Sequence, residues 1–259
     1  MKPPTATDPV TADEVIVHDD GTAIPRRQRT SRSSIEVMHS KGNRHMRPTT
    51  ARNHRAAERG TEVLDAAAVV LARQGYAGTS IDDIADQLGA TKGRVYHYYR
   101  SKADILLGVL NAGVQRLIED VGPMAELADM PAQKRLHRMA VAHAMTMMTH
   151  HPYQVVTFRS LDRHLFEGQG AKGVAWASIV ERRNEYEALF VRVVEEGSQQ
   201  GVFATSDPRL TVRGIFGALN WITVWYNPDA QPEGRATRED IAEHLARFVV
   251  AGAQNGNLL

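Results

Sequence analysis

The segment TKGRVYHYYRSK, residues 91–102, gathers side chains that can bind a polyanion. It holds three tyrosines, one histidine and four lysines or arginines in twelve positions. Ammonium and guanidinium groups bind phosphates, and tyrosine hydroxyls add hydrogen bonds from stiff side chains. Core helices do not carry so much charge, and ordinary solvated helices do not carry so many aromatic rings. The composition therefore indicates a helix with a surface for nucleic acid.

A helical wheel separates this segment into two faces. Val95 and Tyr99 fall on the inward face. The outward face carries Lys92, Gly93, Tyr96 and His97. Glycine is a poor helix former, but its missing side chain lets the backbone approach another surface closely. In a major groove, the N-terminal part of such a helix contacts base edges while its flanks bind phosphates. A solvated face explains each basic residue taken singly, whereas the combined positions of the basic and aromatic residues along the helix favour DNA binding.

The preceding residues, TSIDDIADQLGA, complete a helix-turn-helix motif. Thr79 or Ser80 can cap a helix whose first turn is acidic, as the helix dipole favours. Gly89 ends this helix and Thr91 can cap the next, so two short helices are joined by a tight turn. The inward face of the first of them is formed by Ile81, Ile84, Ala85 and Leu88.

A further helix begins after Ser101, which can cap it with Asp104 as its partner. Lys102 stands in the first turn, where its charge has the unfavourable sign for the helix dipole. Its position is explained if the free N–H groups of this helix end also face a phosphate.

Length and composition exclude several classes of protein. The 259 residues allow one large domain or two modest ones, and the net charge of +1 does not by itself indicate nucleic acid. The absence of cysteine excludes disulfides and thiolate metal sites, and it suits a reducing cytosol. No apolar run reaches the ~18 residues of a transmembrane helix. The N-terminus lacks the pattern of a signal peptide. We expect a cytoplasmic protein with no membrane partner.

The chain divides into three parts, and the fold class is expected to be all-α. Residues 1–53 are acidic and then basic, with few apolar residues, which predicts a disordered basic arm. Such an arm can contact phosphates, or it can be a solubilising tail or the product of an upstream start codon. Residues 54–103 form the helix-turn-helix domain, whose first helix closes at Gly75. Residues 104–259 predict a helical second domain, with helices near 105–121, 131–151, 152–166, 172–199, 208–227 and after Thr237.

Residues 55–106 resemble the DNA-binding domain of the TetR family of bacterial transcriptional repressors. The resemblance rests on the ordered pattern EVLDAAAVVLARQGYAGTSIDDIADQLGATKGRVYHYYRSKADIL. It implies that Thr79 and Ser80 begin a helix that contacts the DNA backbone. It also implies that Lys92, Gly93 and Arg94 lie at base-contacting positions, and that Tyr96, Tyr98 and Lys102 contact phosphates. With the wheel, the expected DNA contacts are Thr79, Ser80, Thr91, Lys92, Gly93, Arg94, Tyr96, His97, Tyr98 and Lys102.

The sequence departs from the family pattern at four points. Tyr98 stands where many members have histidine, and Tyr99 where most have phenylalanine. Gly60 is unusual near the start of the first helix and is expected to loosen it. The N-terminal arm is longer than usual for the family.

The resemblance implies that the second domain binds a small ligand and pairs two chains through its last two long helices. GIFGALNWITVWY suits this pairing, because small residues permit close helix approach and tryptophans bury a large area. The alternative is that these residues fill the domain core. The expected dimer contacts are Gly214, Gly217, Ala218, Trp225 and Phe248.

The ending NWITVWYNP is similar to TetR-family regulators of fatty-acid, acyl-CoA and sterol catabolism, which sense acyl-CoA thioesters. Flexible and aromatic side chains suit the acyl part of such a ligand, and arginines suit its phosphates. The same residues suit a core and a surface equally well. The expected ligand contacts are Met145, Met148, Phe158, Arg159, Trp176, Arg183, Tyr186 and Trp221.

Together these features predict a homodimeric repressor that binds a palindromic operator and is released by a small-molecule effector, with no cofactor, no metal and no catalytic residue. One alternative is an architectural or nucleoid-associated protein without an effector. Another is an enzyme with a metal bound by histidines and an accessory helix-turn-helix. Its candidate ligands are His137, His143, His150, His151 and His164, but their spacing matches no compact metal motif.

Overall fold

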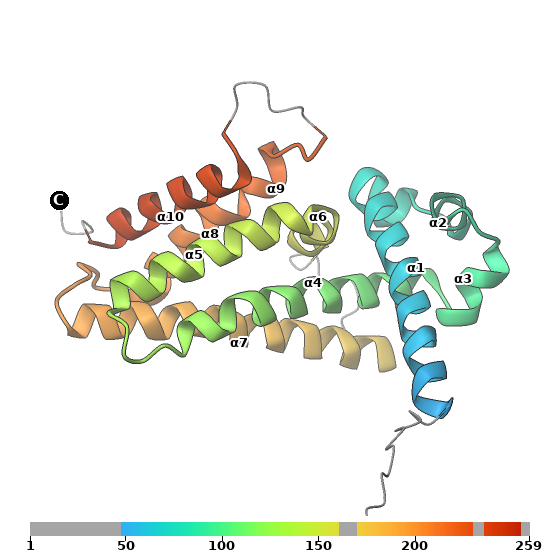
Figure 1. Cartoon of the computed structure of the whole chain (residues 1–259), viewed down its shortest axis with the longest axis horizontal. Coiled ribbons are helices and arrows are strands. Elements are labelled where there is room, and N and C mark those ends of the chain that lie inside the picture. The colour runs from blue at the N-terminus through green and yellow to red at the C-terminus, as the bar shows by residue number, and fades with distance from the viewer. Residues whose placement is uncertain (1–47, 161–169, 230–235, 255–259) are drawn as a thin grey trace, which may run out of the picture. The chain divides into compact units, whose positions relative to one another are not determined.

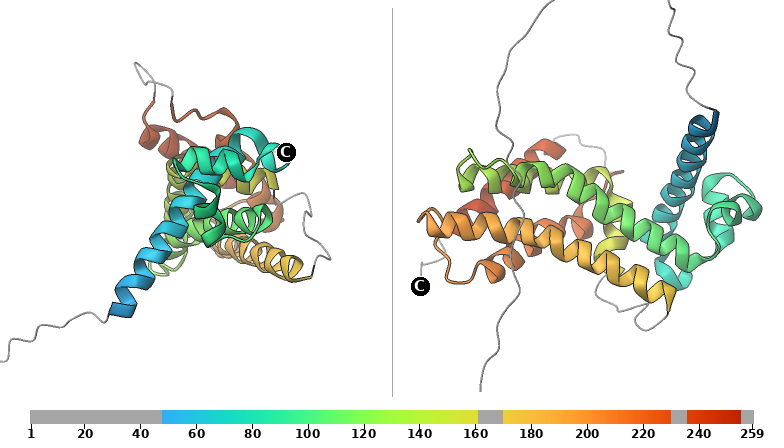
Figure 2. Two further views of the ribbon diagram at one scale, coloured as in Figure 1. Left: turned by 90° about the vertical axis from the view of Figure 1, so that its right-hand side faces the viewer. Right: turned by 90° about the horizontal axis from the view of Figure 1, so that it is seen from below.

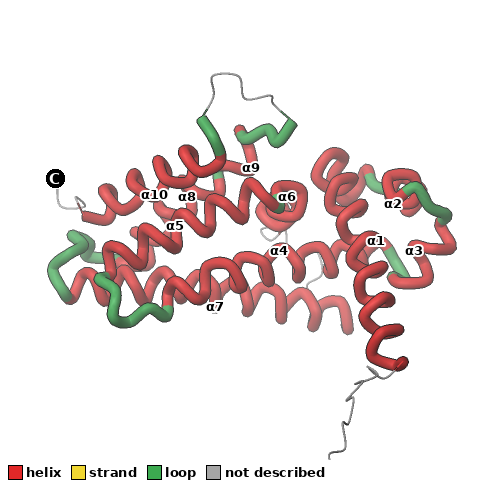
Figure 3. The backbone as a smooth tube through the Cα atoms, in the orientation of Figure 1, coloured by secondary structure: helices red, strands yellow, loops and turns green. Residues whose placement is uncertain are grey.

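The computed structural model describes residues 48–160, 170–229 and 236–254, with side chains from residue 57 onward. These residues form helices and loops without a strand, which confirms the all-α prediction (Figure 3). The helices are α1 (Pro48–Gly78), α2 (Ile81–Leu88), α3 (Lys92–Tyr98), α4 (Lys102–Ala125), α5 (Ala132–Thr149), α6 (His151–Ser160), α7 (Ala171–Gln199), α8 (Pro208–Asn220), α9 (Ile222–Trp225) and α10 (Arg238–Gln254). No helix in the described part combines the length and hydropathy needed to span a membrane.

Helices α1, α2 and α3 form the predicted helix-turn-helix unit (Figure 1). Ser80 caps α2 in a capping box with Asp83: each side chain accepts a hydrogen bond from the other residue's backbone N–H. Gly89 ends α2 in the left-handed region at φ 65°, and Gly75 turns the chain near the end of α1 at φ 72°. Val95 is fully buried, so the opposite face of α3 points outward.

The core on this side of the protein extends beyond the first three helices. It also contains residues of α4, α6 and α7, among them Leu106, Tyr153 and Trp176. A second core lies between α4, α5, α7, α8 and α10, with Leu136, Phe190 and other apolar side chains fully buried. Helix α4 contributes to both cores, and it lies beside α7 in the two views of Figure 2. Side chains on both sides of the domain boundary predicted at residue 103 therefore pack in one core.

Three predicted helix boundaries differ from the structure. Helix α1 begins at Pro48, inside the predicted arm. Once a helix is held by packing, each further residue that joins it adds one hydrogen bond, so extension is easier than starting a new helix. Helix α4 continues through Pro123 to Ala125, since Val121 and Ala125 are buried and hold the last turn in place. The predicted helix 208–227 is interrupted at Trp221 and continues only as the short α9. Residues 1–47 of the predicted arm lie outside the described residues.

Candidate nucleic-acid interface and ligand cavity

The outward face of α3 carries an exposed set of polar and aromatic groups. Thr91, Lys92, Gly93 and His97 are exposed, and the Tyr96 side chain is 52% exposed although it is a large ring. The Lys92 ammonium pairs with the Asp82 carboxylate of α2 at 2.6 Å. This pair is open to solvent, so a DNA phosphate can compete for the lysine at small cost.

Arg94 lies on the flank of the same face and pairs with Glu62 of α1. The guanidinium is therefore partly neutralised in this structure, and contact with a base requires that it leave the carboxylate. Ser80 is exposed at the start of α2, but its hydroxyl contacts the Asp83 carboxylate at 2.7 Å. Both residues are placed where DNA can reach them, and their contacts with it stay a prediction.

Thr79 and Lys102 have internal roles that the sequence did not indicate. Thr79 is 2% exposed, and its hydroxyl donates to the Gly75 carbonyl at 2.7 Å. A side chain covered in this way does not reach a phosphate, which corrects the expectation for Thr79. The Lys102 ammonium donates to the carbonyls of Tyr76 at 2.8 Å and Thr79 at 2.7 Å, and lies 4.6 Å from the centre of the Tyr76 ring. It thereby ties the end of α1 to the start of α4, and its contact with a phosphate stays a prediction.

The tyrosines at the end of α3 face α1. Tyr98 is half-buried against the first core, and the Tyr99 hydroxyl donates to the Gly60 carbonyl at 3.3 Å. A Cβ atom on Gly60 would lie 3.7 Å from the Tyr98 ring, which shows how closely α1 and α3 approach. Gly60 is buried inside α1, so the expected loosening of the helix at this residue is not observed. Its small size instead accommodates the two tyrosines.

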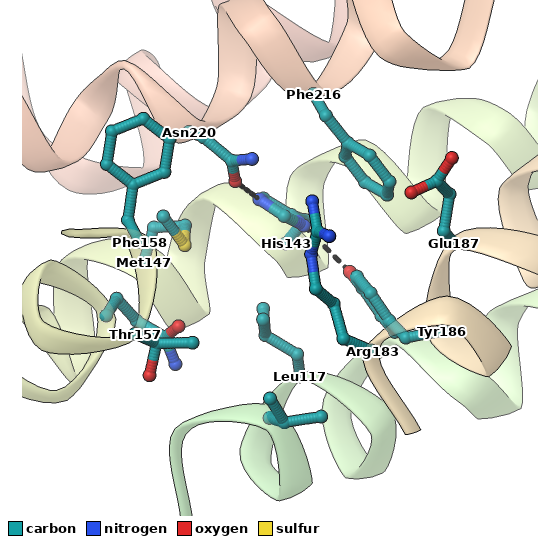
Figure 4. A pocket seen from close by; sticks show the side chains of 12 residues that line it. Leu117, His143, Met147, Thr157, Phe158, Arg183, Tyr186, Glu187, Phe216 and Asn220 are labelled. Atoms are coloured by element: carbon teal, nitrogen blue, oxygen red, sulfur yellow. Dashed lines mark hydrogen bonds between the residues drawn. The ribbon is translucent and has the colours of Figure 1, made fainter. Parts of the chain in front are cut away.

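A cavity of about 90 Å³ lies between α4, α5, α6, α7 and α8 (Figure 4). Five of the twelve lining residues are apolar, and the other seven bring polar or charged groups from α5, α6, α7 and α8. The lining residues are Val114, Leu117, His143, Met147, Gln154, Thr157, Phe158, Arg183, Tyr186, Glu187, Phe216 and Asn220. Apolar side chains together with placed polar groups are typical of small-molecule sites.

His143 is buried at the centre of the cavity lining and uses both ring nitrogens. Its Nδ1 lies 2.7 Å from the Tyr186 hydroxyl and its Nε2 lies 3.1 Å from Asn220 Oδ1 (Figure 4). With Nε2–H donating to Asn220, Nδ1 accepts from the Tyr186 O–H. Burial lowers the pKa of His143 to about 4, against a smaller raising effect of the Asn220 hydrogen bond. The ring is therefore neutral at pH 7, and the centre of the cavity carries no charge from it.

Three of the eight expected ligand contacts line this cavity: Phe158, Arg183 and Tyr186. Arg183 is exposed and lines the cavity, so the cavity reaches the surface at this residue. The other five are elsewhere in the fold. Met145 and Met148 pack in the second core, Trp176 is buried in the first core, Arg159 donates to the Ala72 carbonyl of α1, and Trp221 is 56% exposed.

Sequence reasoning missed the polar centre of the cavity. The sequence suggests His143 only as a metal ligand and gives no signal for Asn220 or Thr157. These residues lie on three different helices, α5, α6 and α8, so no local pattern joins them. Among the described residues there is no group of three or more side chains that could hold a metal ion, and His164 lies outside them.

An apolar face is exposed on α8 and α10. Leu210, Gly214, Gly217 and Trp221 follow one another at helical spacing along α8 and its end, and all four are exposed. On α10, Phe248 is 63% exposed beside the exposed Gly252. Nothing lies within 4 Å of a Cβ atom placed on Gly214, Gly217 or Gly252, so this face has room for another helix. Trp225 is also exposed, whereas Ala218 is half-buried.

Comparison with known proteins places these features in one family. The profile described as "Bacterial regulatory proteins, tetR family" matches residues 63–109, and that described as "Tetracyclin repressor-like, C-terminal domain" matches residues 129–253. The chain belongs to the TetR family. It is thus a DNA-binding transcriptional repressor with the helix-turn-helix in α2 and α3. TetR regulators are homodimers, so one partner of the chain is a second copy of itself.

Individual TetR-family relatives are similar along most of their length. The "HTH-type transcriptional repressor KstR2" of Mycobacterium tuberculosis is 25% identical over 195 residues, 74% of this chain and 90% of that protein. The "Fatty acid metabolism regulator protein" of Bacillus subtilis is 26% identical over 200 residues, 75% of this chain and 95% of that protein. A similar fold is found in the crystal structure of AibR in complex with isovaleryl coenzyme A and operator DNA, with a TM-score of 0.61. The two sequences are 25% identical, and the match covers 73% of this chain and 97% of AibR.

Proposed function

We propose that this TetR-family protein is a homodimeric repressor that binds a palindromic operator through α3 and leaves it when an acyl-CoA binds in the cavity. The observation that carries the proposal is the double role of α6. This helix supplies Gln154, Thr157 and Phe158 to the cavity, and it packs against α1 of the DNA-binding unit. A ligand that moves α6 therefore moves α1.

The size of the cavity supports such a movement. At about 90 Å³ it is smaller than the ~300–1,000 Å³ of typical ligand sites. An acyl chain needs the lining helices to separate, and the ligand then binds better to the separated arrangement. If that arrangement spaces the two α3 helices of the dimer wrongly for successive major grooves, operator affinity falls.

The charge distribution at the cavity supports an acyl-CoA. The apolar lining residues and the neutral His143 suit an uncharged acyl chain. The Arg183 guanidinium suits the phosphates of coenzyme A. The Glu187 carboxylate lies in the same lining, so the arginine has to outweigh it. The similarity to a fatty acid metabolism regulator and to a protein crystallised with isovaleryl coenzyme A agrees with this class of ligand.

The exposed face of α8 and α10 is proposed as the dimer surface, with Gly214, Gly217, Trp225 and Phe248 among its contacts. The exposed face of α3 and the start of α2 is proposed as the DNA surface. We propose no catalytic residue and no cofactor. The place of action is the cytoplasm, where a bacterial operator is located.

A mobility-shift titration of operator DNA tests the effector. Acyl-CoAs are expected to release the DNA, and free coenzyme A is expected to release it much less because it lacks the apolar chain. By reciprocity, operator DNA must weaken acyl-CoA binding by the same factor. Footprinting provides the test against an architectural role: a short symmetric site agrees with the repressor, whereas broad unspecific protection contradicts it.

A further inference from the structure

The exposed face of α3 has a cationic side chain on each flank, Lys92 on one side of the buried Val95 and Arg94 on the other. Each cation is paired with a carboxylate of a neighbouring helix. Lys92 pairs with Asp82 of α2. Arg94 pairs with Glu62 of α1, 32 positions away in the chain. The two negative charges beside this face weaken its attraction for the phosphates of any DNA.

The two carboxylates differ in what explains their positions. Asp82 is in the first turn of α2, where a negative charge stabilises the helix whether or not a lysine is near. Glu62 lies well inside α1, where the helix dipole gives no such preference. The side chains of Arg94 and Glu62 are 39% and 51% exposed, and an ion pair with this exposure adds little to stability. Neither helix formation nor fold stability therefore requires an acid at position 62.

The pair with Glu62 sets a threshold that a DNA contact of Arg94 must exceed. A single phosphate offers the guanidinium about what the carboxylate offers, an ion pair open to water. The edge of a guanine offers more, because its O6 and N7 accept two hydrogen bonds from one guanidinium in a fixed geometry. Exchange of Glu62 for a phosphate is therefore nearly neutral in free energy, whereas exchange for a guanine edge is favourable.

We infer that Glu62 is a specificity-determining residue of the DNA-binding unit: it withholds Arg94 from the phosphates of random DNA and releases it to a base edge in the operator. Specificity then comes partly from a penalty on the wrong partner. The inference rests on the DNA surface proposed at α3, and it is independent of the effector and the cavity. It goes beyond the contacts proposed there, because Glu62 acts on Arg94 and not on the DNA.

Fluorescence anisotropy of the full-length dimer tests the inference on two duplexes of equal length. One is the operator, recovered from random DNA by selection with the wild-type protein, and the other has a random sequence. At low salt, Glu62→Gln is expected to bind the random duplex about tenfold more tightly, with both chains contributing. The salt slope for this duplex should rise by about one unit per chain, because Arg94 gains a phosphate. Operator affinity should rise less, so the ratio of the two affinities falls by at least about threefold.

The same substitution in an Arg94→Ala background separates this effect from simple charge repulsion. Without Arg94, loss of the Glu62 carboxylate only removes a negative charge near the DNA, so it should change the affinity for both duplexes by the same small factor. Glu119→Gln is the control for net charge, since Glu119 is exposed on α4 and accepts a hydrogen bond from Gln115 of the same helix. It should leave the affinity ratio as in wild type. Melting temperatures show that each variant is folded.

The possible results lead to different conclusions. If Glu62→Gln leaves the ratio and the salt slope unchanged while Arg94→Ala lowers discrimination, the inference is overturned and the DNA surface at α3 stands. If Arg94→Ala discriminates as wild type does, Arg94 does not contact bases, and the inference falls with that part of the proposed surface. An equal effect of Glu62→Gln with and without Arg94 also overturns the inference, in favour of charge repulsion. Should Glu62→Gln melt far below wild type, Glu62→Ala replaces it with the same expectations, since alanine is the best helix former.

Discussion

Two residues have contacts in the structure that differ from the roles their positions in the sequence suggest. His143 suggests a metal ligand in the sequence, yet the structure uses it to join Tyr186 to Asn220 inside the cavity. Lys102 suggests a phosphate contact, yet its ammonium is held by two carbonyl groups. In both cases the side chain stabilises the arrangement of helices around a binding surface. Both roles are open to direct measurement.

The first prediction concerns the pH dependence of stability. The pKa of His143 is about 4 in the folded chain and near 6.5 when exposed, so the unfolded chain binds a proton first as the pH falls. Stability is therefore lost between pH 6.5 and pH 4, with no contribution from this group above that window. Between pH 7 and pH 5, the free energy of unfolding should fall by about 2 kcal/mol per chain more in wild type than in His143→Gln.

Urea denaturation at the two pH values, at one fixed protein concentration, measures this difference. His97→Gln is the control, since His97 is exposed on α3 and should leave the pH dependence of wild type unchanged. Identical pH dependence in His143→Gln and wild type would contradict a neutral, buried imidazole.

The second prediction separates the two lysines of the DNA-binding unit. Lys102→Ala should lower stability by about 1–2 kcal/mol, because the carbonyls of Tyr76 and Thr79 lose a charged donor. Lys92→Ala should change stability by less than about 0.5 kcal/mol, because its ion pair is exposed. On DNA the order reverses: Lys92→Ala should reduce discrimination between operator variants more strongly.

Thermal melting and fluorescence anisotropy over a range of salt concentrations provide both readouts. If Lys102 also contacts a phosphate in the complex, the salt slope of its variant falls by about one unit per chain. A Lys102→Ala protein that melts like wild type would show that its contacts with α1 contribute nothing.

At the scale of the elements, α6 and α1 are joined by polar contacts, among them a cluster around Tyr153. The Tyr153 hydroxyl donates to the Asp65 carboxylate of α1 at 2.8 Å, and the Arg116 guanidinium of α4 lies 3.9 Å from the centre of the Tyr153 ring. Burial and the neighbouring Asp65 raise the pKa of Tyr153, so the hydroxyl keeps its proton and remains a donor. Because Gln154 and Thr157 of the same helix line the cavity, α6 contacts both the cavity and α1, and we propose that this cluster couples them.

The third prediction follows from this link. Tyr153→Phe removes one hydroxyl and leaves the ring in place, so operator affinity without ligand should stay close to that of wild type. The factor by which an acyl-CoA lowers operator affinity should fall by about fivefold, because α1 follows α6 less closely. Anisotropy of labelled operator with and without octanoyl-CoA measures this factor. Tyr226→Phe is the control, since the Tyr226 hydroxyl contacts Arg238 instead. The same factor in Tyr153→Phe and wild type would remove the cluster from the coupling.

The elements themselves were largely predictable, because their ends depend on local chemistry. The expected caps at Ser80 and Ser101 are observed, as are the turn at Gly75 and the helix end at Gly89. The continuation of α4 through Pro123 and the break at Trp221 were not predictable. Both depend on packing against distant helices, which outweighs the local signal. For the same reason the sequence identified cavity candidates such as Tyr186 but could not separate them from core residues such as Met148.

At the scale of the whole molecule, the described part of one chain leaves an apolar surface without a partner. Leu210, Trp221 and Phe248 are exposed on α8, its end and α10, and the glycines between them have open space above them. Large exposed apolar residues that share a face mark an interaction site. Two copies that pair through this face bury the same residues on both sides, which fits the two-fold symmetry of a palindromic operator.

The last prediction tests this face with a single charge. Phe248→Asp should raise the dimer dissociation constant at least about a hundredfold, because it removes a large apolar contact and places a carboxylate where its symmetry partner would also lie. Operator affinity should fall with it, since a monomer contacts only one half-site. Val174→Asp is the matched control: Val174 is 72% exposed on α7, outside this face, and its variant should remain dimeric and bind the operator as wild type does. Sedimentation at several concentrations measures the dissociation constant. If Phe248→Asp stays dimeric at the concentration where wild type is dimeric, the dimer surface lies elsewhere. If both variants are monomeric, any added acidic residue disrupts the dimer, and α8 and α10 have no special part in it.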